Sequence, residues 1–165
     1  MPLVNNVTRL LEAHKIAYEA RELPVEKLGA AEAARVMGVP PEQVFKTIVV
    51  TRDRQALASR GKKSILALVP GPASVSLKKL ASFLGEKKLY LPTEREAEQL
   101  TGLQAGGISP LALINKGFQV VIDLVAHNHE TIYVSGGQRG LDIHLPVDAL
   151  VRLTNARFGD IVQED

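Results

Sequence analysis

The segment QVVIDLVAHNHETIYVSGGQRGLDIHL, residues 119–145, contains three apolar stretches separated by short polar connections. We expect strands over 119–124, 131–135 and 141–145, because β-branched and aromatic residues favour the extended backbone of a sheet. The connections between them are only five or six residues long. A parallel crossover needs about a dozen residues or more, so these connections favour antiparallel pairing over a doubly wound parallel sheet.

Helices and strands also alternate upstream of this segment. The apolar spacing predicts amphipathic helices over 5–14 and 30–37. Asn5 or Asn6 can cap the first helix, and Gly38 is a typical left-handed end for the second. Further strands are expected over 16–23, 44–51 and 64–69.

Capping residues mark three more helices. Ser76 begins one that Gly85 ends, and Thr93 and Glu96 form a capping box at the start of another. Pro146 stands in the first turn of a last helix, where its missing N–H leaves no hydrogen bond unmade. Helices and strands are therefore mixed along the chain, which predicts the α+β class.

The composition is typical of a soluble globular protein, with 45% hydrophobic and 23% charged residues. A chain of 165 residues predicts one domain, over 1–165, because a domain usually has about 100–200 residues. Aromatic residues make up only 4%, so aliphatic side chains must fill the core.

The chain contains no cysteine, which excludes disulfides, thiolate metal sites and a cysteine nucleophile. No apolar stretch reaches the ~18 residues of a membrane span, and residues 1–8 lack the basic and apolar regions of a signal peptide. We therefore expect a cytoplasmic protein that is not bound to a membrane.

The net charge of +2 does not by itself indicate a nucleic-acid partner, but the basic residues are unevenly distributed. Five of them fall between the strands expected at 44–51 and 64–69: Arg52, Arg54, Arg60, Lys62 and Lys63. This segment is either a solvated hairpin loop or an arm that contacts phosphates.

Common catalytic and metal-binding motifs are absent. His127 and His129 could share one face of a strand, but the sequence shows no third ligand beside them. An exposed turn is therefore the simpler interpretation, and we expect neither a metal nor another cofactor.

One lysine and two glycine pairs are candidates for a binding site. Lys46 interrupts the apolar run VFKTIVV (44–50), so its ammonium must reach a cleft, a partner or the solvent at the strand end. The pairs Gly106-Gly107 and Gly136-Gly137 either form tight turns or offer backbone N–H groups to a ligand.

Several motifs in a fixed order resemble the YbaK (also EbsC) family, whose members are stand-alone relatives of the editing domain in bacterial prolyl-tRNA synthetases. The motifs are FKT (45–47), GGISPL (106–111), YVSGG (133–137) and RGLDI (139–143). The similarity begins near residues 15–18 and covers nearly the whole chain. It implies a mixed, mostly antiparallel, barrel-like sheet surrounded by helices.

The resemblance implies a deacylase that acts on tRNA(Pro) mischarged with cysteine, with Cys-tRNA(Cys) as a further substrate and prolyl-tRNA synthetase as a plausible partner. The family's essential lysine matches Lys46. Its substrate-pocket residues match Tyr18, Thr47, Gly107, Ser135 and Asp142, and Gly106 and Gly136 offer further backbone donors. Where several relatives carry an aromatic residue before a glycine, this chain has Leu28. Arg52, Arg54, Lys62 and Lys63 are the expected tRNA contacts.

Two mechanisms are compatible with these residues. In the first, favoured by the resemblance, the thiol of the cysteine attacks its own ester and releases a thiolactone. In the second, the nucleophile is Ser135 activated by Lys46, or a water molecule. Alternative functions are a related hydrolase for Ala-, Ser- or Thr-tRNA and a non-catalytic module that binds aminoacyl-tRNA.

Overall fold

The computed structural model describes residues 4–58 and 63–164. The described residues form five α-helices, namely α1 (Asn6–Ala13), α2 (Ala30–Met37), α3 (Leu77–Leu84), α4 (Glu94–Thr101) and α5 (Val147–Thr154). The strands are β1 (Glu19–Glu22), β2 (Phe45–Val50), β3 (Ile65–Pro70), β4 (Gln119–Asp123), β5 (Thr131–Ser135), β6 (Leu141–Pro146) and β7 (Arg157–Gly159). Short 3-10 helices occur at Pro41–Gln43 (η1), Ala56–Ala58 (η2) and Leu124–Asn128 (η3).

Local capping interactions place the helix ends where the sequence predicts them. The Asn5 side chain accepts from Thr8 N at 2.9 Å, and Thr93 and Glu96 form the expected reciprocal box. The three glycines Gly38, Gly85 and Gly102 end their helices in the left-handed conformation. Pro146 precedes α5 as its N-cap, one position before the predicted one.

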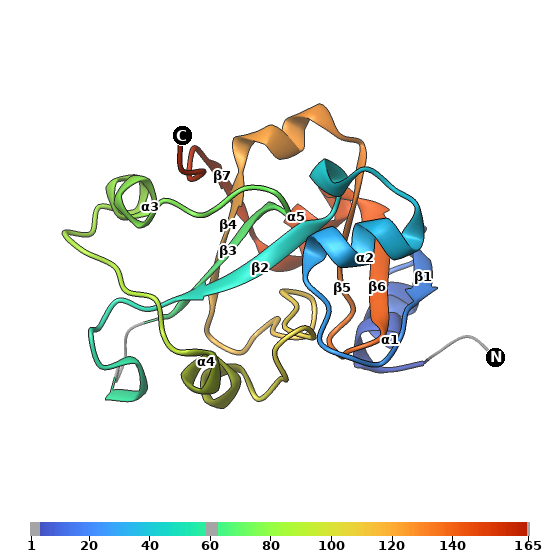
Figure 1. Cartoon of the computed structure of the whole chain (residues 1–165), viewed down its shortest axis with the longest axis horizontal. Coiled ribbons are helices and arrows are strands. Elements are labelled where there is room, and N and C mark those ends of the chain that lie inside the picture. The colour runs from blue at the N-terminus through green and yellow to red at the C-terminus, as the bar shows by residue number, and fades with distance from the viewer. Residues whose placement is uncertain (1–3, 59–62, 165) are drawn as a thin grey trace.

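The strands form two sheets, and the α+β class is confirmed. The three-stranded sheet has the order β1-β6-β5 with antiparallel pairs throughout, and the four-stranded sheet has the order β2-β3-β4-β7. The two sheets lie side by side (Figure 1), and an isolated parallel bridge between Val44 and Tyr133 joins them.

The expected antiparallel pairing is right for β5 and β6 but wrong for β4. That strand pairs in parallel with β3 on one side and with β7 on the other. The chain changes sheets at η3, where the Asp123 carboxylate accepts from Val125 N and from Ile161 N, both at 3.0 Å. The sequence analysis missed β7, which has only three residues.

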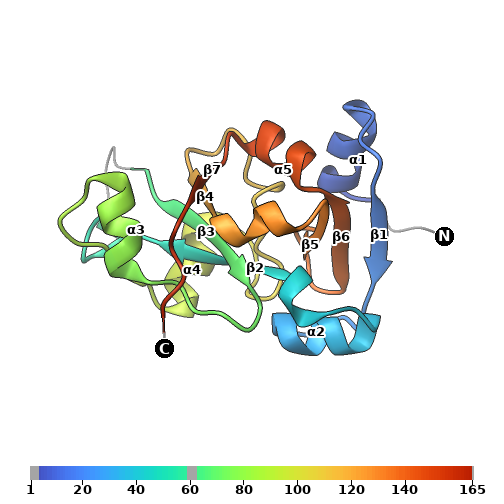
Figure 2. The ribbon, with the colours of Figure 1, turned by 90° about the horizontal axis from the view of Figure 1, so that it is seen from above.

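The main core lies between the two sheets and the helices α1 and α5. α2 covers the opposite face of the three-stranded sheet (Figure 2), where Ala33, Ala34 and Met37 pack on Val44 and Tyr133. α3 covers the other face of the four-stranded sheet through Leu80 and Ala81. No helix in the described residues is long and apolar enough to span a membrane.

The two glycine-rich turns pack directly against each other. A Cβ atom on Gly107 would lie 2.8 Å from Gln138 Cα, and one on Gly136 would lie 2.6 Å from the Leu141 side chain. Arg139 Nε donates to Ala105 O at 2.7 Å and ties the turns together. Gly107 is thus required by close packing against backbone atoms, and Gly136 by close packing against the Leu141 side chain.

We predict that Gly107→Ala lowers the free energy of unfolding by about 2 kcal/mol, because the added methyl group meets main-chain atoms that cannot rotate away. The melting temperature should fall by about 4–8 °C for a chain of this size. Gly29→Ala is the matched control, since nothing lies within 4 Å of its Cβ position. Equal losses in both variants, measured by urea and thermal denaturation, would contradict the packing argument.

Candidate functional site

A cleft of about 400 Å³ opens beyond the bridge that joins the sheets. Val44 and Tyr133 are paired, but β2 and β5 then continue into different sheets. The space between them is bounded by α2, the start of α4 and the loop around Gly106. Its polar side chains are Lys27, Lys46, Thr47, Thr93, Glu94, Ser135 and Asp142.

Thr47 places a buried hydroxyl in this cleft. Its Oγ1 atom has no hydrogen-bond partner, and no other buried side-chain polar atom in the described residues is left in that state. A buried hydroxyl that makes no hydrogen bond lowers the stability of the folded protein by about 1–3 kcal/mol. A group kept at that cost beside a cavity is well suited to bind a polar ligand.

Ser135 and Asp142 face each other across the β5–β6 ladder, at positions that are directly paired. Burial raises the pKa of the Asp142 carboxyl to about 6. Arg21 is paired with Asp142 on the other side, but its guanidinium donates to Met37 O at 3.2 Å and lies 3.6 Å from Glu19. The Asp142 carboxylate is therefore available to a cation from outside the protein.

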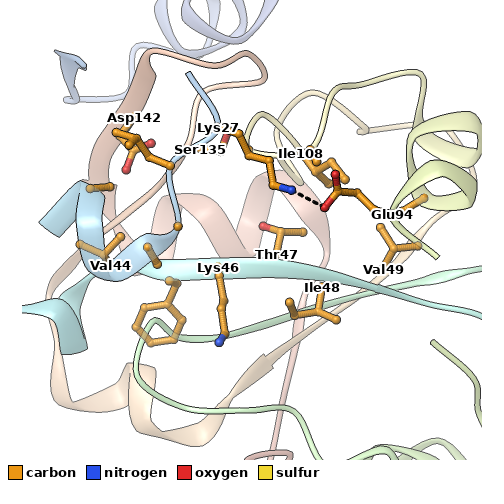
Figure 3. Close-up of a pocket in the computed structure, with 18 of the residues that line it drawn as sticks. Lys27, Val44, Lys46, Thr47, Ile48, Val49, Glu94, Ile108, Ser135 and Asp142 are labelled. Carbon is orange, nitrogen blue, oxygen red and sulfur yellow. Dashed lines mark hydrogen bonds and ion pairs between the residues drawn. The ribbon is translucent and has the colours of Figure 1, made fainter. Parts of the chain in front are cut away.

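Lys46 borders the cleft from the edge strand β2, but its side chain leaves the strand on the side opposite to Thr47. Figure 3 shows its nitrogen directed away from Ser135 and Asp142. Partial burial lowers the pKa of the Lys46 ammonium, and no described residue forms an ion pair or a hydrogen bond with it. To act in the cleft, this flexible side chain must turn around the free edge of β2.

The sequence analysis missed an ion pair at the cleft. Lys27 Nζ lies 2.7 Å from Glu94 Oε2, and both side chains are about half exposed. Figure 3 shows the pair connecting the segment before α2 to the first turn of α4. The capping box at Thr93 was the available signal, since it places Glu94 at a helix N-terminus, but nothing local identifies Lys27 as its partner.

Three of the expected substrate-binding residues do not line the cleft. Tyr18 packs against the main core, and its hydroxyl donates to Glu12 Oε1 at 3.0 Å. Burial raises the pKa of this hydroxyl, and the hydrogen bond to Glu12 raises it further. The Gly107 N–H donates to Gln104 O and the Gly136 N–H to Leu141 O, both at 2.8 Å. In contrast, Gly106 lines the cleft as expected.

The basic hairpin segment contains residues in different situations. Arg52 is an internal connector, with its side chain only 14% exposed and Nε 2.8 Å from Glu86 Oε2. Its Nη2 donates to Gln119 Oε1 at 2.6 Å, and its Nη1 donates to Lys63 O. Arg54 and Lys63 are exposed, whereas Lys62 lies outside the described residues.

Neither Ser135 nor any histidine forms a nucleophile–base pair in the described part of the cleft. Ser135 Oγ accepts from Gly137 N at 3.3 Å, and no base lies within hydrogen-bond distance. His127 stacks on Phe158, and no group of three metal-ligating side chains occurs among the described residues. Among the described residues of the cleft, the Thr47 hydroxyl and the Asp142 carboxylate can accept hydrogen bonds from a polar or cationic group.

The family described as the aminoacyl-tRNA editing domain matches residues 26–153. A protein of Enterococcus faecalis, EbsC, named as a candidate Cys-tRNA(Pro)/Cys-tRNA(Cys) deacylase, is 31% identical over 97% of this chain and 94% of its own length. The proline–tRNA ligase of Desulforamulus reducens is 35% identical over 98 residues, which are 59% of this chain and 16% of that protein.

Solved structures show the same fold at lower identity. The hypothetical protein APE2540 has a TM-score of 0.82 at 21% identity, with coverage of 96% of this chain and all of that one. A candidate trans-editing enzyme for prolyl-tRNA synthetase has a TM-score of 0.77 at 24% identity, covering 98% and 99% of the two chains.

We predict that Asp142→Asn changes how stability depends on pH. The raised pKa means that the folded protein binds the Asp142 proton more tightly than the unfolded chain, so stability is lost as pH rises from about 4 through about 6. Relative to the wild type, Asp142→Asn should therefore gain about 2 kcal/mol between pH 4 and pH 7.5.

Urea denaturation across this pH range measures the difference. Thr47→Val is the matched control, because it removes the other buried polar group of the cleft but has nothing to titrate. Its stability relative to the wild type should be independent of pH. A constant difference for Asp142→Asn would show that the carboxylate is not buried as described.

Proposed function

Because the chain belongs to the aminoacyl-tRNA editing-domain family, we propose that it acts in trans as a deacylase that removes cysteine from mischarged tRNA(Pro). The observation that supports this most directly is the unoccupied hydrogen-bonding capacity of the cleft, at Thr47 and Asp142. The name of the E. faecalis relative, which aligns along nearly its whole length, supports cysteine as the amino acid.

The α-ammonium of the aminoacyl group would pair with Asp142. An ammonium beside this carboxylate replaces the solvation that burial has removed, in a charge-assisted hydrogen bond. Thr47 and Ser135 are then placed to meet the carbonyl or the ribose hydroxyl. A cavity of about 400 Å³ is within the ~300–1,000 Å³ range of small-molecule sites, enough for an amino acid and the end of its nucleotide.

Lys46 would provide the positive charge that faces the phosphate and the reacting ester. Once turned around the edge of β2, its ammonium can neutralise the terminal phosphate or the negative charge that develops on the ester oxygens. The lack of an internal partner for Lys46 among the described residues supports this role, since no existing ion pair must be broken. Partial burial lowers the pKa of the Lys46 ammonium, and a bound phosphate would favour its charged form.

The substrate thiol would be the nucleophile. Its sulfur forms a bond to the carbonyl carbon, the carbon–oxygen bond to the ribose breaks, and the thiol proton passes to the departing ribose oxygen. The products are a cysteine thiolactone and free tRNA. Two observations support this route: the chain contains no cysteine, and Ser135 forms no hydrogen bond to a base among the described residues.

The expected substrate profile follows from this mechanism. Cys-tRNA(Pro) should be deacylated, whereas the same tRNA carrying S-methylcysteine, alanine or serine should be cleaved at least ~100-fold more slowly, because these lack the attacking thiol. Release of free tRNA measures the rate, and mass spectrometry should detect the thiolactone before free cysteine. Ser135→Ala should keep kcat/KM within about tenfold of the wild type.

Other outcomes separate the alternatives. Rapid cleavage of the S-methylated substrate together with an inactive Ser135→Ala would assign the attack to Ser135. Preference for alanyl or seryl esters would indicate a related hydrolase. Tight binding of Cys-tRNA(Pro) without turnover would leave only a binding module, which contradicts the proposal.

We predict that Lys46→Ala reduces deacylation of Cys-tRNA(Pro) by at least ~100-fold, the usual loss when a transition-state charge partner is removed. The fold should be intact, because the ammonium has no internal partner to lose. Lys46→Arg should restore little activity, since a planar guanidinium does not replace a compact ammonium. Lys78→Ala, at an exposed position on α3, is the control and should be fully active; comparable turnover by Lys46→Ala would refute the role of Lys46.

A further inference from the structure

Two adjoining hollows lie outside the cleft, beside the loop that leads into β4 and the C-terminal end of α5. Their volumes are about 400 Å³ and about 430 Å³, and they share Ile114, Asn115 and Leu153. Together they form one groove, which we call the α5 furrow. Its polar side chains include Lys63, Gln119 and Arg157 at one end and His14 and Arg152 at the other.

The furrow is cationic although the protein as a whole is nearly neutral. Lys63, Arg152 and Arg157 line it, and no described aspartate or glutamate does. The cleft differs, since Glu94 and Asp142 balance its two lysines. This charge pattern favours an anionic ligand that extends along both hollows.

Two cations of the furrow, Lys63 and Arg157, have no polar side-chain partner in the part of the chain that the structure describes. Neither Lys63 nor Arg157 forms an ion pair or a side-chain hydrogen bond with any described residue. The Arg157 guanidinium lies 4.7 Å from the centre of the Phe83 ring, a cation–π contact. A guanidinium in such a contact keeps its N–H donors, which suit phosphate oxygens.

Arg52 positions this end of the furrow. Its guanidinium donates to the main chain at Lys63 and to Gln119 Oε1, so that the NH₂ group of Gln119 is left as a donor. Arg52 also pairs with Glu86 and thereby neutralises that carboxylate. Arg52, which the sequence predicts as a tRNA contact, instead positions Lys63 and Gln119.

From these observations we propose that the α5 furrow binds the phosphodiester backbone of the tRNA whose 3′ end occupies the cleft. This inference rests on the proposed function. Arginine, lysine and side-chain amides are the usual donors to phosphate oxygens, and they fix the orientation of a nucleic acid without reading its sequence. The furrow would therefore hold the body of the tRNA.

β2 runs from the cleft towards Arg52, which contacts two residues of the furrow, Lys63 and Gln119. The cleft lies at the first half of β2, and Arg52 follows the end of that strand. From Thr47 to Arg52 the chain advances about 17 Å, at ~3.4 Å per residue. A stacked strand also rises about 3.4 Å per nucleotide, so phosphates about five nucleotides from the ester reach the furrow. These belong to the junction between the single-stranded 3′ end and the acceptor stem.

The test compares charge reversals inside and outside the furrow. Lys63→Glu/Arg157→Glu should raise the Kd for uncharged tRNA(Pro) at least ~10-fold and reduce the salt slope of log K by about 2, one for each lost phosphate contact. Arg152→Glu, which does not alter the contacts of Phe83 or Arg52, should reduce the salt slope of log K by about 1. Lys78→Glu/Lys87→Glu makes the same change in net charge elsewhere and should leave Kd within about twofold.

A minimal substrate separates this proposal from the proposed function. The cysteinyl ester of a CCA trinucleotide does not reach the furrow, so the furrow variants should cleave it at the wild-type rate. Wild-type affinity for tRNA in the furrow variants overturns the furrow and leaves the deacylase in place. Loss of tRNA binding in them, with a wild type that cleaves no ester, overturns the deacylase and supports the furrow.

Two further results would also overturn the proposal. Equal weakening by the control pair would indicate a general effect of net charge. Calorimetry also measures the binding of inorganic phosphate. If the wild type binds phosphate and the furrow variants do not, while their affinity for tRNA is unchanged, the furrow is a site for a small anion. Melting temperatures of all variants establish that the differences arise from binding.

Discussion

The pairing of Val44 with Tyr133 is the contact on which the arrangement of the site depends. It is the point where β2 and β5 meet before they enter different sheets. Both residues are almost completely buried, and α2 packs over them. Gly71 completes this corner, since its N–H donates to Val44 O at 2.7 Å and a Cβ there would meet Ala30 at 2.9 Å. The cleft exists because this corner holds two diverging strands together at one end.

Divergence of the strands leaves the Thr47 hydroxyl buried without a partner and removes much of the solvent around the Asp142 carboxyl. A continuous sheet would fill the space with side chains, whereas here Thr47 and Asp142 face a cavity. Such groups reduce the stability of the free protein because they lose water and gain nothing in return. The same property makes them effective in binding, since a polar substrate meets donors and acceptors that need not first release another partner.

Basic residues that are close in the sequence have two different roles in the structure. Arg52 and Lys63 belong to the same basic segment, but Arg52 is fixed by three internal hydrogen bonds and Lys63 faces a groove. The first organises the protein and the second is free for a partner. Charge counts along a chain do not separate these roles, because the partners Glu86 and Gln119 lie 34 and 67 residues away.

The sequence alone determined the helix ends, the α+β class and a set of residues around one cleft. Caps such as Asn5, Thr93 and Gly85 act within four residues, so their chemistry can be recognised locally. The family motifs also located Lys46, Thr47, Ser135 and Asp142, which all border the cleft. Tertiary structure decided the rest: the parallel partners of β4, the direction of Lys46, the position of Tyr18 and the partners of Arg52. These depend on which strands pair and which faces are covered, and such contacts between distant residues leave no periodic pattern in the chain.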